Sequence, residues 1–172
     1  MLDLPENNEL TTEPETLESD LDYRVGLLPE YQYLVFRAGA EQYCLSVLEI
    51  EEVIEWLDPA PIPLAPPYLR GIINLRGAII PVLDIAYGEV QREGAPPQHL
   101  VVALWNGEGG RVLRVGLIAD ELFGTCVSSK LVMVEEPSSE GPHCRGMLQY
   151  TGGLALAIDL SRLAETFPIP GI

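Results

Sequence analysis

The stretch RGIINLRGAIIPVLDI, residues 70–85, contains the strongest fold signal in this chain. Two apolar runs rich in Ile, Val and Leu, residue types that favour β-strands, surround one central charge at Arg76. Gly71 and Gly77 bracket this arginine, and glycine lets a chain turn tightly. We therefore predict two strands, residues 71–75 and 78–85, joined by a turn that holds Arg76. Pro81 lacks a backbone N–H, so its strand should lie at a sheet edge or carry a bulge there.

Similar strand signals precede and follow this stretch. Residues 31–38 alternate in two-residue steps and should form a hairpin with residues 43–46 through the turn at 39–42. Further strand-like runs lie between turn signals, at residues 99–106, 111–120, 124–137, 144–150 and 154–159. About ten short strands with turns every 8 to 12 residues or so are typical of a barrel, a sandwich or two small barrels.

A change of apolar period predicts a short helix after the first hairpin. Val47, Ile50 and Ile54 are spaced by three and four residues, as on one face of a helix. Ser46 and Glu49 fit the Ser-x-x-Glu capping box. The helix should therefore begin at Val47.

Two further segments have clear local signals. Residues 58–67 contain five prolines, so neither a helix nor a central strand is expected there, and the segment should form a stiff, extended loop. Residues 160–167 should form a second short helix, which Asp159 caps and Pro168 ends.

Composition and charge limit the classes of partner. The chain has 172 residues, enough for one domain with its own core, and its net charge is −16. Residues 1–30 carry nine acids and one base, which is half of that charge. We predict a disordered acidic tail at residues 1–29. Acidity argues against binding to nucleic acid or anionic membranes, and neither a signal peptide nor a membrane-spanning segment is expected.

The residues able to do chemistry do not form a recognisable site. Cys44, Cys126 and Cys144 are widely spaced in or beside apolar stretches, and we interpret them as small buried hydrophobes in a reducing compartment. His143 precedes Cys144, but neighbours in a strand point to opposite faces. No metal-ligand spacing is present. The sequence predicts no catalytic residue, no metal and no cofactor, which favours an interaction module in the cytoplasm.

The opening stretch also carries a family resemblance. With Leu69 added it reads LRGIINLRGAIIPVLDI and resembles the signature of CheW-like chemotaxis coupling domains, in which Asn-Leu-Arg-Gly, here residues 74–77, is followed by a strand with Pro81 and Asp84. Similar segments are YLVFRAGAEQYCLSVLEIEEVIE, VGLIAD and GLALAIDLSRL, residues 33–55, 115–120 and 153–163. The resemblance covers roughly residues 31–167.

This resemblance implies a mainly β fold of two small five-stranded SH3-like β-barrels that share a hydrophobic core, with short helices. The implied CheW-like domain spans residues 30–168, between the acidic tail and a C-terminal tail at residues 169–172. The strand count above agrees with this fold class.

The resemblance also implies a non-enzymatic adaptor in two-component signal transduction. Such a scaffold couples a methyl-accepting chemoreceptor-type protein to a CheA-type histidine kinase in chemotaxis, phototaxis or pilus-based motility. The protein would be cytoplasmic and recruited to receptor arrays at the membrane without inserting into it. Two alternatives are an isolated kinase regulatory domain of the same fold and an unrelated small β-barrel that binds a ligand.

Carried over residue by residue, the family's receptor-facing groove falls on six positions. They are Ile50, Glu52, Gly71, Asn74, Leu75 and Arg76. An arginine fixed by flanking strands loses little freedom when it binds a partner carboxylate or helix end. The structural alternative is that Arg76 orients its own turn through an internal salt bridge to Glu52 or Asp84.

Overall fold

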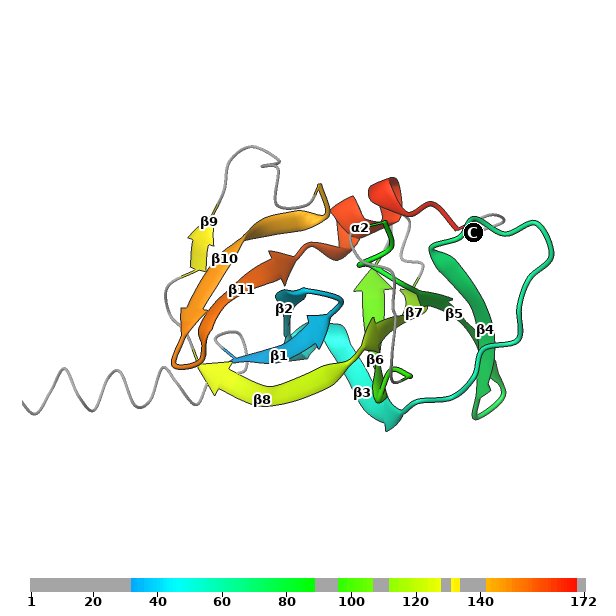
Figure 1. The fold of residues 1–172 in the computed structure, drawn as a ribbon, viewed down its shortest axis with the longest axis horizontal. Coiled ribbons are helices and arrows are strands. Elements are labelled where there is room, and N and C mark those ends of the chain that lie inside the picture. The colour runs from blue at the N-terminus through cyan, green and yellow to red at the C-terminus, as the bar shows by residue number, and fades with distance from the viewer. Residues whose placement is uncertain (1–31, 89–95, 107–111, 128–130, 134–141, 170–172) are drawn as a thin grey trace, which may run out of the picture.

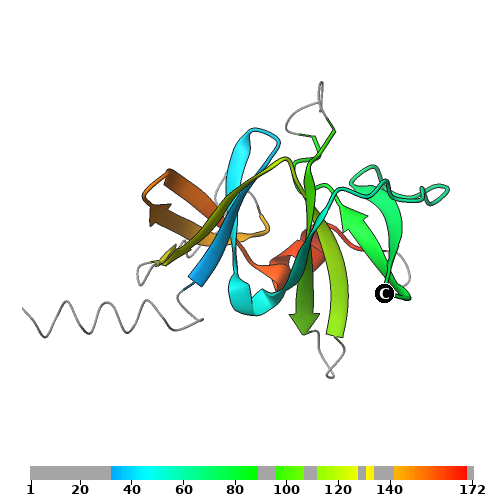
Figure 2. The same cartoon turned by 90° about the horizontal axis from the view of Figure 1, so that it is seen from below.

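The computed structural model describes residues 32–88, 96–106, 112–127, 131–133 and 142–169. Within these ranges the chain forms two β-sheets that lie side by side, with one α-helix where they meet (Figures 1 and 2). The elements are β1 (Gln32–Ala38), β2 (Glu41–Ser46), η2 (Val47–Glu49), β3 (Ile50–Glu55), β4 (Leu69–Leu75), β5 (Ala78–Leu83), β6 (His99–Asn106), β7 (Val112–Ala119), β8 (Glu121–Val127), β9 (Leu131–Met133), β10 (Cys144–Tyr150), β11 (Gly153–Ile158) and α2 (Leu160–Thr166). The predicted tail at residues 1–29 and the turn residues 107–110 lie outside the described residues.

Each sheet combines hairpins with one parallel pair of strands. The first has the order β8-β1-β2-β11-β10-β9 and the second the order β3-β6-β7-β5-β4. The predicted hairpin is confirmed by the β1–β2 pairing from Tyr33 opposite Ser46 to Ala38 opposite Glu41. The first sheet has six strands instead of the predicted five because the short β9 pairs with β10.

The apolar core confirms the prediction that the two barrels share one hydrophobic core. One cluster draws on both sheets and on α2, and its fully buried side chains include Phe36, Tyr43, Leu117 and Ile158. A second cluster, around Val35 and Leu148, belongs to the first sheet alone. A third, around Ile80 and Val102, belongs to the second sheet alone. Each sheet therefore forms a subdomain with an apolar interior of its own, and the first, large cluster joins the two subdomains.

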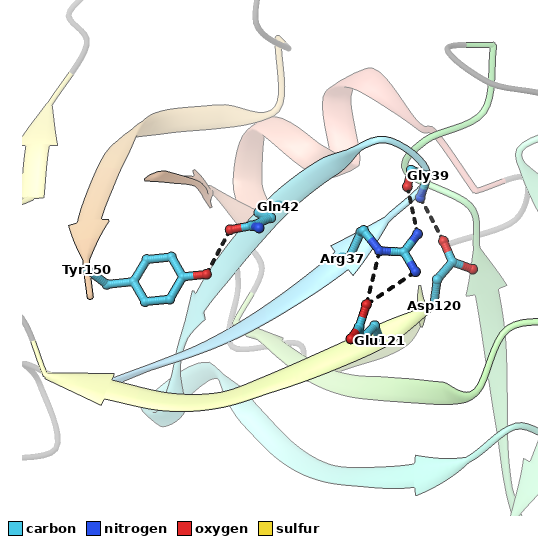
Figure 3. Close-up of polar contacts among 6 residues, drawn as sticks. All are labelled: Arg37, Gly39, Gln42, Asp120, Glu121 and Tyr150. Carbon is cyan, nitrogen blue, oxygen red and sulfur yellow. Dashed lines mark hydrogen bonds and ion pairs between the residues drawn. The ribbon is translucent and has the colours of Figure 1, made fainter. Parts of the chain in front are cut away.

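The crossover from the second sheet to the first is fixed by polar contacts at Asp120, between β7 and β8 (Figure 3). The Asp120 carboxylate accepts a hydrogen bond from the Gly39 N–H at 2.7 Å. Its own N–H donates to the Arg37 carbonyl at 2.8 Å. The Arg37 guanidinium binds the Gly39 carbonyl at 3.0 Å and lies 3.4 Å from Glu121. These contacts hold the β1–β2 turn against the junction of the two subdomains.

Of the two predicted helices, only the second forms as an α-helix. The Asp159 side chain accepts hydrogen bonds from the N–H groups of Ser161 and Arg162 at 2.9 and 3.2 Å, which confirms α2 and its cap. The helix predicted from Val47 is wrong beyond its first turn. Only the 3-10 turn η2 forms there, with the Ser46 side chain accepting from the Leu48 N–H, and the chain is already extended at Ile50.

The predicted loop at residues 58–67, here the proline loop, runs along the outer side of the second subdomain (Figures 1 and 2). It covers the free edge of β4 through a two-way backbone bridge between Ala60 and Ile72. β5 as a whole is not an edge strand, because it lies between β4 and β7, but at Pro81 itself it pairs only with β4, which agrees with the local prediction. The β5–β7 pairing begins at Val82, one residue after the proline.

Candidate docking surface

A two-residue turn presents Arg76 between β4 and β5, with Leu75 paired to Ala78 across it. Its central residues Arg76 and Gly77, here the Arg76 turn, have φ values of 51° and 88°. Both are positive, as a type I′ hairpin turn requires, and that turn favours Asn, Asp or Gly. The Asn74 side chain accepts the Gly77 N–H at 2.9 Å and fixes the turn. Arginine is unfavourable at this φ. Its presence at this position therefore indicates that its side chain has a role.

The Arg76 side chain pairs with Glu52, one of the two predicted internal partners. A guanidinium nitrogen lies 2.9 Å from the Glu52 carboxylate, and the two side chains are 78% and 20% exposed. Glu52 belongs to β3 and the turn follows β4, so the contact joins the two edges of the second sheet. The sheet therefore curves until its two edge strands approach each other. Asp84 is 3.9 Å from Arg70 instead.

The six predicted receptor-facing residues divide into two groups. Glu52, Asn74 and Arg76 come together at the Arg76 turn, next to the partly buried Leu75, which packs on the interior of the second barrel. Ile50 packs against the shared core. Gly71 is buried beneath the proline loop, where an added Cβ would lie 2.2 Å from the Ala60 carbonyl oxygen. The structure thus gives these last two positions packing roles.

The neighbouring Glu51 makes a contact that the sequence reasoning missed. Glu51 and Glu52 both lie on strand β3, and Glu51 sits at a break in the β3–β6 register. Its carboxylate binds the Arg114 guanidinium at 2.6 and 3.0 Å. These hydrogen bonds lower the pKa of Glu51. Two adjacent glutamates therefore hold arginines of two different elements, the Arg76 turn and β7.

Burial shifts the pKa values of two cysteines and one histidine toward their neutral forms. Burial raises the pKa of the Cys44 thiol to about 12 and that of Cys126 above its usual range. Burial lowers the pKa of His143 to about 4, and its ring packs 5.8 Å from Tyr43 and 5.4 Å from Phe167. Among the described residues, no group of three or more His, Cys, Asp and Glu side chains could hold a metal ion. The same part of the chain contains no helix long and apolar enough to cross a membrane.

Fold and surface together define a class of protein: a pair of small β-barrels on a shared core that displays a preformed, charged turn. Residues 32–167 match the CheW-like domain family, and the chain belongs to that family. The resemblance drawn from the Asn-Leu-Arg-Gly stretch is thereby confirmed, as is the fold class of two SH3-like barrels.

Several named relatives share most of their length with this chain. It is 30% identical over 132 residues to the probable chemotaxis protein CheW of Rhizobium etli, covering 74% of this chain and 78% of the relative. It is 26% identical over 145 residues to the chemotaxis protein CheW of Thermotoga maritima, covering 83% and 93%.

A solved structure extends the similarity to the fold. The scaffolding protein TtCheW from Thermoanaerobacter tengcongensis superposes with a TM-score of 0.66 at 25% identity, covering 77% of this chain and 86% of that one. These matches do not favour the two alternatives, an isolated kinase regulatory domain and an unrelated ligand-binding barrel.

Proposed function

We propose that this protein is a chemotaxis coupling scaffold that binds a methyl-accepting chemoreceptor-type protein and a CheA-type histidine kinase at the same time. The observation that supports this most strongly is the family match over residues 32–167. A relative in that family is named a chemotaxis protein and the similar structure a scaffolding protein. The proposed role is non-enzymatic, needs no cofactor, and places the protein in the cytoplasm at receptor arrays.

The Arg76 turn is the proposed receptor contact, with Glu52, Asn74 and Leu75 around it. Ile50 and Gly71, the other two predicted positions, would support this surface through their packing. Guanidinium carries five N–H donors in a rigid fork, and the contact to Glu52 engages one end of it. The rest of the exposed group can bind a carboxylate or the carbonyl end of a receptor helix. Because the turn is already formed, binding of the receptor costs little conformational entropy.

The Arg76–Glu52 ion pair contributes little to stability, so a loss of docking can be distinguished from a loss of folding. The arginine is 78% exposed, and exposed ion pairs contribute about 0 to 1 kcal/mol to folding. Replacement by alanine also leaves a residue at positive φ, so no backbone strain is relieved. An effect of Arg76→Ala on coupling with little effect on unfolding therefore supports docking.

The test measures binding of the Arg76→Ala protein to a receptor signalling fragment and, separately, to the kinase. We expect receptor affinity to fall at least tenfold and kinase affinity and the urea midpoint to stay unchanged. Arg114→Ala is the matched control, because it removes an exposed, paired arginine from the same barrel. Equal receptor affinity of wild type and Arg76→Ala would refute this surface, and wild type that binds neither partner would refute the function.

A further inference from the structure

A hollow of about 160 Å³ lies between helix α2 and the second sheet, and we call it the α2 hollow. Its walls come from β7, from α2 and from the segment that follows the helix (α2 and β7 are labelled in Figure 1), and they include Leu113, Val115, Leu163, Ala164, Phe167 and Ile169. Three of these side chains, those of Leu113, Ala164 and Ile169, are partly exposed. The hollow can therefore be reached from solvent.

The hollow exists because one residue on the apolar face of α2 is small. This face has the i, i+3, i+4, i+7 spacing of an amphipathic helix and consists of Leu160, Leu163, Ala164 and Phe167, all of which line the hollow. The two leucines and the phenylalanine are buried, whereas Ala164 is partly exposed. Protein interiors rarely leave voids larger than a water molecule. Leucine is nearly as good a helix former as alanine and would project into this space, so alanine at position 164 keeps it open.

The wall that follows the helix is held in place without a ligand. The Phe167 N–H donates to the Leu163 carbonyl at 2.8 Å, and the Tyr68 hydroxyl donates to the Pro168 carbonyl at 2.8 Å. The rings of Tyr68 and Phe167 also meet edge to face, with their centroids 5.1 Å apart. Because these walls are already ordered, binding in the hollow costs little conformational entropy.

The charges at the hollow favour a neutral ligand. Arg114 is the charged residue among the described residues that line it. Its guanidinium is already engaged by the Glu51 carboxylate, through hydrogen bonds of 2.6 and 3.0 Å. A charged ligand would have to leave water for a wall whose described charge is already paired, and that transfer is costly.

The size of the hollow favours a single ring. Apolar cavities of about 150 Å³ stay dry and bind molecules the size of benzene, and the α2 hollow has about 160 Å³. A helix with its side chains is about 10 Å across, so a protein partner could place no more than one side chain here. Trp105 and Phe167 line the hollow and offer aromatic surfaces, which attract another ring by stacking or by edge contact.

We propose that the α2 hollow is a binding site for a small neutral molecule that consists of a single aromatic ring with small apolar substituents. The ring packs against α2 on one side and β7 on the other. The site is separate from the Arg76 turn, because Leu83, at the far end of β5 from that turn, lines the hollow, and six residues of strand span roughly 17 Å. The proposal therefore does not depend on the coupling function.

The test uses toluene as the probe and Trp105 as the reporter. The chain has two tryptophans, so Trp56→Phe leaves Trp105 as the single one. In this background toluene should change the Trp105 emission in a saturable way. It should also raise the Tm by an amount that grows with its concentration, since it binds the folded state. Benzoate, the same ring with a carboxylate, should produce neither effect at equal concentration.

Two leucine substitutions on α2 locate the binding. Ala164→Leu places bulk in the hollow, so toluene affinity should fall at least tenfold while the Tm without toluene stays equal or rises. Glu165→Leu is the matched control, because it adds the same side chain at the next, exposed position, which does not line the hollow. Its toluene affinity should equal that of the background protein.

Three results would overturn the proposal. The first is the absence of a saturable response to toluene up to its solubility, which would mean that the hollow is closed or filled. The second is equal toluene affinity with and without Ala164→Leu, because the ring would then bind elsewhere. The third is equal binding of benzoate, which would contradict a site for neutral molecules. Receptor and kinase binding are measured separately, so none of these results bears on the proposed function.

Discussion

Replacing Gly71 with alanine should damage the second barrel at the proline loop. Gly71 has a φ of 143°, which L-residues rarely adopt, and its missing Cβ leaves room for the Ala60 backbone. An added Cβ would lie 2.2 Å from the Ala60 carbonyl oxygen and 2.8 Å from its carbon. Since both atoms belong to backbone, the loop must move away from β4.

The cost of this movement can be worked out from the contacts that it breaks. The strained φ contributes about 1 to 3 kcal/mol. Two hydrogen bonds between Ala60 and Ile72 are lost, at about 1 kcal/mol each. We expect Gly71→Ala to lower the free energy of unfolding by roughly 4 kcal/mol, a large part of the stability of about 5 to 15 kcal/mol of an ordinary domain.

Gly77→Ala is the matched control in the same hairpin. Gly77 also has a positive φ, 88°, but nothing lies within 4 Å of an added Cβ. Only the strain remains, so the loss should be about 1 to 2 kcal/mol. Urea unfolding followed by tryptophan fluorescence measures both, and hydrogen exchange at the Ile72 amide should speed up only in Gly71→Ala. Equal losses in the two variants would refute the close approach of loop and strand.

Three other variants or measurements test the interior. The unfolded state binds a proton at His143 near pH 6.5 and the folded state only near pH 4, so stability should fall by about 3 kcal/mol as pH drops through that window. His143→Phe should lose that part of the pH slope, and an identical slope in both proteins would contradict the buried, uncharged ring. Asp159→Ala should cost about 1 kcal/mol in urea unfolding by removing the cap of α2, and no loss would argue against the cap. Under native conditions a thiol reagent should modify Cys126 before the buried Cys44, as mass spectrometry of peptides can show; the reverse order would contradict their burial.

Local chemistry made much of the fold predictable. The hairpins followed from alternation and from glycine at their turns, and the cap of α2 followed from one aspartate before an apolar helix. The helix predicted at Val47 failed because Ile50 and Ile54 are four residues apart. That spacing puts both side chains on one face in a helix and also in a strand, whose period is two. Pairing with β6 decided for the strand.

The site was less predictable because its contacts join distant segments. The sequence pointed to Arg76 and proposed Glu52 as a partner, but these two residues are 24 positions apart and meet only when the second sheet curves into a barrel. The pairing of Glu51 with Arg114 depends on an irregularity in β3 that has no sequence signal.

Sedimentation of the kinase with a receptor-containing membrane, measured as this protein is titrated, tests the coupling role most directly. A linker with two separate docking surfaces should raise the sedimented kinase from its baseline to a maximum. Excess linker should then lower it again, because each partner is saturated by a different copy. Kinase sedimentation that does not depend on the concentration of this protein would contradict the account.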